Sequence, residues 1–281
     1  MASLKAGLFV ITLILTVVLV YFTRDFYAGN GSNIASSREA GEKLDDNIHD
    51  GFINVHLENR QNVVRVFYRE FNPLDKEIET GGVHGDDGDS EREKPMKMDV
   101  LLLHGRKFSS RTWLNLGTIR ILGENGHRTV AVDLPGFGLS EGHASLRGDT
   151  EKHQLSRAKF LKEIIEVLGL IRPAIVAPSF SGSFALPLLA TRSRMFGAFI
   201  PVAPVHTERF PPEVYMKIKV PTLIVYGSKD KSARVSLHNL RYLPLHEVVE
   251  LPDASHPAYL DQTAMWHARL KLFLNGQKVL H

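Results

Sequence analysis

The stretch IVAPSFSGSFA, residues Ile175–Ala185, places three serines at alternate positions directly after a short apolar run. Short apolar runs are typical of strands buried in a parallel sheet, and the small residues that follow predict a sharp turn into a helix. A serine on such a turn is a candidate nucleophile, because the turn exposes its hydroxyl. The pattern does not by itself say which serine occupies that position.

The flanking residues favour Ser179. A nucleophile on this turn needs small residues two positions before and after it, because the strand and helix backbones approach closely. Ser179 has Ala177 and Ser181 there, but Ser181 also satisfies the rule. The predicted strand ends at Ala177, and Gly182 gives Ser179 a second small residue where Ser181 would have Phe184. Neither flanking position of Ser179 is glycine, so a polar turn that caps the next helix is the alternative.

The rest of the chain alternates short apolar runs with helical stretches, which predicts an α/β fold with a mostly parallel sheet and helices on both faces. Two alternating segments, FINVHLE and NVVRVFYREF, predict an antiparallel hairpin that opens the domain. The other predicted strands are 99–104, 128–133, 173–177, 198–203, 221–227 and 247–251. The predicted helices are 112–124, 152–168, one after Ser181, 235–243 and 263–275.

Chemically useful side chains follow the predicted strands, at the edge where α/β sheets bind ligands. Asp230 follows PTLIVYG, and His256 follows the last strand. A serine hydroxyl needs a base, and the base needs an orienting group on its other nitrogen. His256 and Asp230 fit these roles for Ser179, whereas we interpret the rival acid Asp253 as a turn residue.

The ordered set of motifs resembles the α/β-hydrolase superfamily over nearly all of residues 52–281. It consists of LLLHGRKFSS, DLPGFGLS, the strand-to-helix serine, an acid after the next-to-last strand and a histidine after the last. With SHPAYLD and the short spacings, the chain is most similar to the alpha/beta-hydrolase domain-containing protein 14 group. The resemblance implies a Ser179, His256 and Asp230 triad, with the backbone N–H groups of Arg106 and Phe180 as oxyanion donors. Only a short segment follows AFIPVA, which predicts a minimal cap.

The resulting hypothesis is a serine hydrolase that acts on an ester, thioester or amide acyl group through an acyl-enzyme. The alternatives are an acyltransferase with the same triad and a non-catalytic binding or signalling module. The substrate would be a small molecule or an acylated molecule, and no metal or organic cofactor is required. Arg106, Lys107 and residues 206–216 would lie at the mouth of the site, and the sequence leaves open whether Arg106 and Lys107 meet an anionic substrate or solvent.

Composition excludes several classes of protein. The net charge of +3 is small and the charges are interspersed, which argues against a nucleic-acid partner. The absence of cysteine excludes disulfides, thiol nucleophiles and cysteine-ligated metals. No protein partner is indicated.

The N-terminus carries an uncharged apolar run at residues 6–22, between Lys5 and Arg24. At about 1.5 Å per residue it would span roughly 25 Å, which predicts a transmembrane signal-anchor without an adjacent cleavage site. We therefore expect a membrane-bound, single-pass type II protein of the secretory pathway, the A form of the resembled group, with a lumenal or extracellular catalytic domain. Asn30 begins a glycosylation pattern. The predicted organisation is a cytoplasmic tail (1–5), the anchor (6–22), a stem (23–50) and a hydrolase domain (51–281) with a mobile acidic insertion (72–97).

Overall fold

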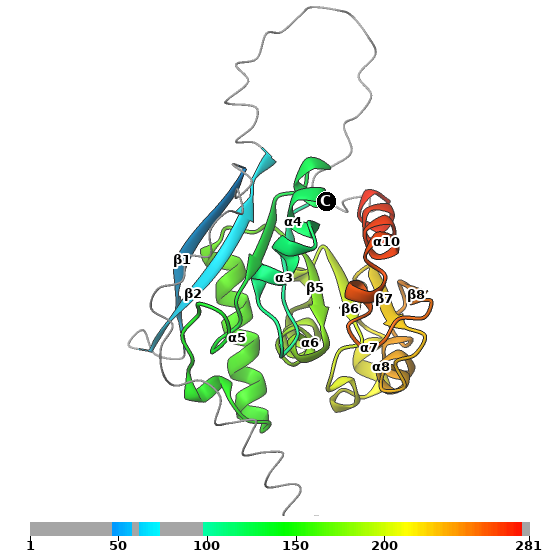
Figure 1. Ribbon diagram of the computed structural model, residues 1–281. Coiled ribbons are helices and arrows are strands. Elements are labelled where there is room, and N and C mark those ends of the chain that lie inside the picture. Colours follow the sequence, from blue (N-terminus) through cyan, green and yellow to red (C-terminus); the bar gives the residue numbers. More distant parts are fainter. Residues whose placement is uncertain (1–46, 58–61, 74–97, 277–281) are drawn as a thin grey trace, which may run out of the picture. The chain divides into compact units, whose positions relative to one another are not determined.

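An eight-stranded sheet organises the computed structural model, which describes residues 47–57, 62–73 and 98–276 (Figure 1). The strand order is β1-β2-β4-β3-β5-β6-β7-β8. β1 pairs with β2 and β2 with β4 in antiparallel fashion, and the remaining pairs are parallel. The predicted α/β class and the N-terminal hairpin are confirmed. The strands are β1 (Ile48–His56), β2 (Val63–Phe71), β3 (Val100–Leu102), β4 (Thr129–Val132), β5 (Ala174–Pro178), β6 (Ala198–Val202), β7 (Thr222–Gly227) and β8 (His246–Leu251).

Helices cover both faces of the sheet, as the sequence predicts (Figure 1). Successive strand residues point to opposite faces, so Leu101 and Leu103 pack in one apolar cluster while Val100 and Leu102 pack in the other. The first cluster lies under α5, α6 and α8, and the second lies under α3, α4 and α10. The helices are α3 (Ser110–Asn115), α4 (Thr118–Glu124), α5 (Glu151–Val167), α6 (Gly182–Arg192), α7 (Pro212–Tyr215), α8 (Ala233–Leu240), α9 (Ala258–Asp261) and α10 (Thr263–Asn275).

Several element boundaries differ from the prediction, and three of them bear on the site or on the start of the domain. The helix predicted at 112–124 is divided into α3 and α4, because Gly117 takes a φ of 71° that interrupts the helical ladder. β5 extends to Pro178, which pairs with Val202, so the turn begins one residue later than expected. β1 begins at Ile48, a few residues before the predicted start of the domain.

The sheet topology brings the predicted site residues to one edge. β5 lies in the middle of the strand order, and Ser179 follows it directly. The carboxyl ends of the parallel strands β3, β5, β6, β7 and β8 meet at this same edge. Segments that are distant in the sequence therefore converge around Ser179.

The predicted localisation, a single-pass type II membrane protein with a lumenal or extracellular catalytic domain, is corrected. Within residues 47–57, 62–73 and 98–276, no helix is long and apolar enough to span a bilayer. The longest helix there, α5, has 17 residues and carries charged side chains along its length. The run at 6–22, Asn30, most of the stem and residues 74–97 of the acidic insertion lie outside the described residues.

Candidate active site

Ser179 occupies a strained turn between β5 and α6. Its φ of 49° lies in the left-handed region, which non-glycine residues seldom adopt. The Ser179 carbonyl accepts a hydrogen bond from the Val205 N–H at 3.0 Å, which ties the turn to the segment after β6. A Cβ added at Gly182 would lie 2.6 Å from Pro204 Cβ and 3.0 Å from the Val205 carbonyl oxygen. The glycine that permits close backbone approach is therefore Gly182, three residues beyond Ser179.

The three alternating serines have different partners. Ser181 Oγ donates to the Pro178 carbonyl oxygen at 2.8 Å, and Ser183 Oγ donates to the Phe180 carbonyl oxygen at 2.8 Å. Both of these hydroxyls cap local backbone. Ser179 Oγ instead lies 2.8 Å from His256 Nε2. The serine favoured by the sequence is thus the one beside the histidine.

Ser179, His256 and Asp230 form a hydrogen-bonded relay. His256 Nδ1 lies 2.7 Å from Asp230 Oδ2. An ionised Asp230 accepts from the Nδ1–H, and the unprotonated Nε2 then accepts the proton of Ser179. The Asp230 side chain is 4% exposed and that of His256 is 42% exposed, so the acid is shielded while the imidazole is open to solvent. This arrangement suits proton transfer from Ser179 to His256.

Ser232 binds the second carboxylate oxygen of Asp230, a contact that was not predicted from the sequence. Its N–H and Oγ both donate to Asp230 Oδ1, at 2.9 and 2.5 Å. Burial opposes ionisation of Asp230, but the hydrogen bonds from Ser232 and His256 outweigh it and lower the pKa of the carboxyl below its usual value. The acid is therefore ionised and fixed in orientation. An aspartate followed two residues later by serine is a recognisable turn pattern that could have predicted this contact.

Asp253 is not placed to act on His256. It has a left-handed φ of 57°, its side chain is 79% exposed, and it pairs with Lys229 at 3.0 Å. The Asp253 N–H donates a hydrogen bond to Ser228 Oγ at 2.8 Å. The interpretation of Asp253 as a turn residue agrees with these contacts.

The turn after β3 lies against Ser179. A Cβ added at Gly105 would lie 3.8 Å from Ser179 Cβ. The Phe108 N–H closes this turn by donating to the Gly105 carbonyl oxygen at 3.0 Å, which leaves the N–H of Arg106 outside the turn's own hydrogen bond. Phe180 is the second residue of the helical turn Ser179–Ser181, where N–H groups lack intrahelical acceptors. The predicted oxyanion donors Arg106 and Phe180 thus flank Ser179.

His104 braces the turn from within the core. Its Nε2 accepts the Leu134 N–H at 2.8 Å, so its Nδ1–H is the group that donates to the Gly105 carbonyl oxygen at 2.8 Å. Burial lowers the pKa of the ring, which keeps it neutral in this role.

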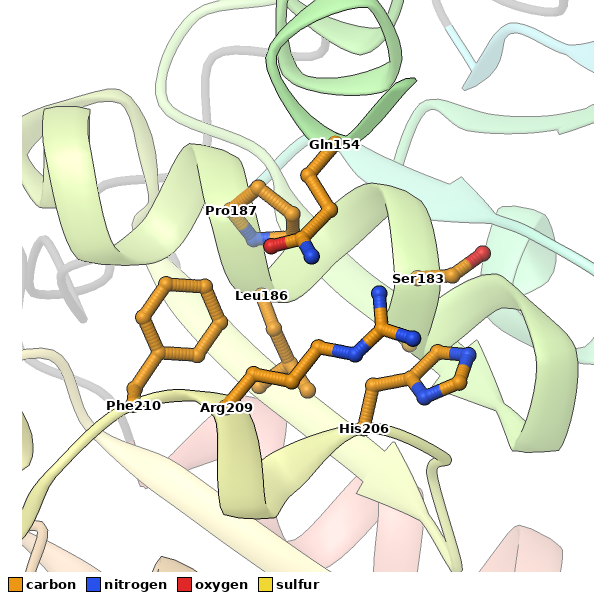
Figure 2. A pocket seen from close by; sticks show the side chains of 8 residues that line it. Gln154, Ser183, Leu186, Pro187, His206, Arg209 and Phe210 are labelled. Carbon is orange, nitrogen blue, oxygen red and sulfur yellow. The ribbon is translucent and has the colours of Figure 1, made fainter. Parts of the chain in front are cut away.

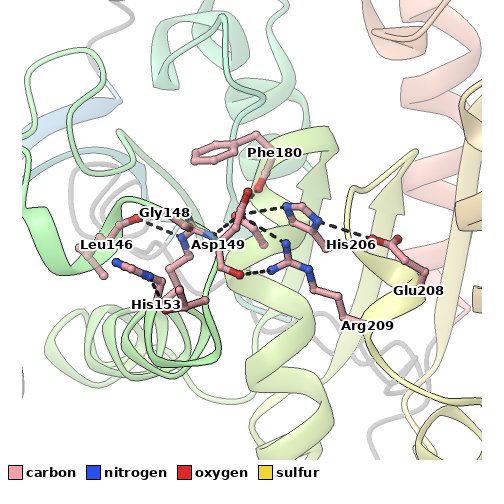
Figure 3. Close-up of polar contacts among 11 residues, drawn as sticks. Leu146, Gly148, Asp149, His153, Phe180, His206, Glu208 and Arg209 are labelled. Carbon is pink, nitrogen blue, oxygen red and sulfur yellow. Dashed lines mark hydrogen bonds and ion pairs between the residues drawn. The ribbon is translucent and has the colours of Figure 1, made fainter.

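Four titratable side chains meet beside Phe180, an arrangement that the sequence did not predict. Arg157, Asp149, His206 and Arg209 meet there, as Figure 3 shows in part. Asp149 Oδ1 lies 3.5 Å from both His206 Nε2 and Arg209 Nη2, and 3.9 Å from Arg157 Nη1. Asp149 precedes α5, Arg157 lies within α5, and His206 and Arg209 lie in the segment after β6, so no local pattern in the sequence links them. We call these four residues the arginine cluster.

Comparison with known proteins assigns the chain to a family, although no protein-family model matches it. The human protein named "Putative protein-lysine deacylase ABHD14B" is 41% identical over 180 residues, which are 64% of this chain and 84% of that protein. The chain belongs to the ABHD14 family of α/β-hydrolases. The mouse protein named "Protein ABHD14A" is 36% identical over 212 residues, covering 75% of this chain and 76% of that protein. The predicted family is confirmed, and the predicted A form is not, since the ABHD14 relatives include both forms.

Solved structures share the fold of this ABHD14 family member. A CIB-like hydrolase from Thermoplasma acidophilum matches with a TM-score of 0.63 at 22% identity, over 81% of this chain and 99% of that chain. The carboxylesterase CesB from Bacillus subtilis matches with a TM-score of 0.58 at 15% identity, over 80% of this chain and 92% of that chain. At these identities the similarity establishes the α/β-hydrolase fold.

Proposed function

We propose that this ABHD14 family member is a serine hydrolase that removes an acyl group from an ester, thioester or amide through an acyl-enzyme on Ser179. The observation that carries the proposal is the relay from Ser179 Oγ to His256 Nε2 at 2.8 Å and from His256 Nδ1 to Asp230 Oδ2 at 2.7 Å. The human relative's name contains the words protein-lysine deacylase, which favours an acylated lysine amide as the substrate.

The proposed reaction has two balanced halves. Ser179 Oγ attacks the acyl carbon while its proton passes to His256 Nε2, and the Arg106 and Phe180 N–H groups bind the oxyanion. The bond to the leaving amine, alcohol or thiol then breaks as His256 returns that proton to it. Water attacks the resulting ester on Ser179, His256 removes one of its protons, and collapse releases the carboxylic acid and restores the serine hydroxyl. The exposed edge of His256 gives water access for this second half.

Labelling with a fluorophosphonate probe tests the proposal. The wild-type protein should label, and Ser179→Ala should not, because only the Ser179 hydroxyl contacts His256 among the three serines of the turn. Hydrolysis of acyl substrates should fall by at least about 10³-fold in the same variant.

Ser181→Ala and Ser183→Ala are matched controls, since their hydroxyls donate to backbone carbonyls and should leave labelling intact. Labelling that persists in Ser179→Ala and disappears in Ser181→Ala would show that the nucleophile is Ser181 and that the assignment to Ser179 is wrong. A folded wild-type protein that does not label would contradict the hydrolase proposal and favour a non-catalytic module.

A further inference from the structure

The arginine cluster lies beside Phe180, the residue that follows the proposed nucleophile. Phe180 follows Ser179, and its ring lies 4.4 Å from Arg106 Cζ and 5.7 Å from Arg157 Cζ. Arg157 is buried, with 3% of its surface exposed. A guanidinium is expensive to bury without carboxylate or phosphate partners, so its position calls for a physical reason.

The carboxylates available in the described structure leave this positive charge poorly neutralised. The Asp149 carboxylate is 67% exposed and lies 3.5 Å from Arg209 Nη2 and 3.9 Å from Arg157 Nη1, beyond a good hydrogen bond. Arg157 Nε and Nη2 donate to the carbonyl oxygens of Leu146 and Gly148 at 3.1 and 2.9 Å, whereas the buried Nη1 has no hydrogen-bond partner among the described residues. Burial lowers the pKa of Arg157, and the charges of Arg106 and Arg209 lower it further against the attraction of Asp149. The free donor on Nη1 is therefore suited to an anionic group.

Two residues of the cluster border a shallow surface hollow. Arg209 and His206 line a hollow whose apolar side is formed by Leu186, Pro187 and Phe210 (Figure 2). The hollow is about 160 Å³ including space open to solvent, below the range of about 300–1,000 Å³ for drug-sized ligands. It also reaches Gly182 and Ser183, in the first turn of the helix that follows Ser179. The chemistry of this lining, apolar side chains beside Arg209 and His206, suits methylene groups that end in a carboxylate.

The acyl group of the proposed substrate is expected on the side of Ser179 that holds Phe180. His256 must return a proton to the leaving group, so the leaving group lies beside His256, which follows β8. The Phe180 ring instead packs against Phe137 and Phe184, toward α5 and the loop before it. An acyl group whose oxygen is bound by the Phe180 N–H therefore extends toward the arginines.

We propose that the acyl group accepted by Ser179 ends in a carboxylate, which Arg157 and Arg209 bind in exchange for their loose contacts with Asp149. The preferred substrates are then monoacyl derivatives of short dicarboxylic acids. Arg106 adds positive charge at the mouth of the site, where it would attract the same anionic substrate. This inference rests on the serine hydrolase proposal and specifies its substrate class.

Two peptides that differ only at the end of the acyl chain test the inference with the full-length protein. One carries Nε-glutaryl-lysine and the other Nε-pentanoyl-lysine, which have the same number of acyl carbons. We expect kcat/KM for the glutaryl peptide to be at least about tenfold higher at low salt, with the advantage shrinking as salt is added. Each peptide is also assayed for how far it slows fluorophosphonate labelling of Ser179.

Two variants with opposite expected effects on use of the glutaryl peptide distinguish a loss of binding from structural damage. Arg209→Gln should bring the two kcat/KM values to within about twofold, because the carboxylate loses its accessible partner. Asp149→Asn should lower KM for the glutaryl peptide alone, because the competing carboxylate is gone. Arg120→Gln is the matched control, since Arg120 is an exposed arginine on α4 that lies 3.9 Å from Glu124. A merely structural cluster would impair both peptides in both cluster variants.

The outcomes distinguish this inference from the function on which it rests. A wild-type protein that labels at Ser179 but treats the two peptides alike, or binds neither, overturns the carboxylate specificity and leaves the serine hydrolase in place. Equal selectivity in wild type and Arg209→Gln also overturns it. A folded wild-type protein that does not label overturns the hydrolase and this inference together.

Discussion

The relay and the arginine cluster both join an aspartate to a histidine, but they differ in geometry. The relay contacts are 2.7 and 2.8 Å, and its acid is 4% exposed. In the cluster, Asp149 lies 3.5 Å from His206 and is 67% exposed. Burial and the charge of Arg209 lower the pKa of His206 against the pull of Asp149 and Glu208, so its ring is mainly neutral near pH 7.

This difference corresponds to two kinds of chemistry. Short hydrogen bonds with fixed partners hold an imidazole in one tautomer, as proton transfer requires. Long contacts among charges are individually weak, and another anion can replace the carboxylate in them. Residue type alone therefore does not identify a catalytic histidine. The distance to its partners and its burial distinguish a catalytic histidine from other histidines.

The largest expected effect comes from removing the charge of the relay acid. Asp230→Asn should lower kcat by about 10³- to 10⁴-fold, because an amide cannot stabilise the imidazolium and favours the wrong tautomer of His256. Hydrolysis of the preferred acyl peptide measures the loss. Circular dichroism verifies the fold.

Asp253→Asn is the matched control for that change. Asp253 lies near His256 in sequence, yet its side chain is exposed and pairs with Lys229. Its kcat should stay within about twofold of wild type, as expected for an exposed pair. A large loss in Asp253→Asn with a small one in Asp230→Asn would reverse the assignment of the acid.

A moderate effect is expected where the two regions meet. Gly182 begins α6 beside Ser179, and it packs against Pro204 and Val205, which precede His206. Gly182→Ala gains about 1 kcal/mol of helix propensity, but the new Cβ at 2.6 Å from Pro204 Cβ forces a backbone shift. The cost of the backbone shift should exceed the gain in helix propensity, so the unfolding free energy should fall by about 1–3 kcal/mol and the Tm by several degrees.

Gly276→Ala is the control for Gly182→Ala, because its added Cβ would meet its nearest atom only at 3.4 Å. Thermal unfolding of the two variants in parallel separates crowding from the general cost of replacing a glycine. If Gly182→Ala is as stable as Gly276→Ala, the turn can relax without moving the segment that carries His206.

Sequence could identify the relay because each member obeys a local rule. Ser179, Asp230 and His256 each follow a strand, and parallel strands bring their carboxyl ends to one edge. The arginine cluster follows no such rule, because it depends on how the loop before α5 meets the segment after β6. The division of the predicted helix at Gly117 was readable in principle, since an interior glycine weakens a helix prediction.

The smallest expected effect is at Ser232, which holds the second oxygen of the relay acid at 2.5 Å. Ser232→Ala should lower kcat by about fivefold, equivalent to one hydrogen bond of about 1 kcal/mol, with KM nearly unchanged. Ser232→Thr keeps the hydroxyl and should restore the rate. A loss of the same size in the threonine variant would assign Ser232 to packing alone.

The same variant should also change the pH dependence of stability. The folded-state pKa of Asp230 is depressed, with burial opposed by the hydrogen bonds from Ser232 and His256, so those bonds stabilise the fold fully above the unfolded-state pKa of about 4. Their contribution is lost as the pH falls through the folded-state pKa. Urea unfolding should therefore show a constant difference between wild type and Ser232→Ala from pH 7 to about 5, and a shrinking one below about 4. A difference that does not change with pH would mean that Ser232 acts on the backbone turn and leaves the charge of Asp230 untouched.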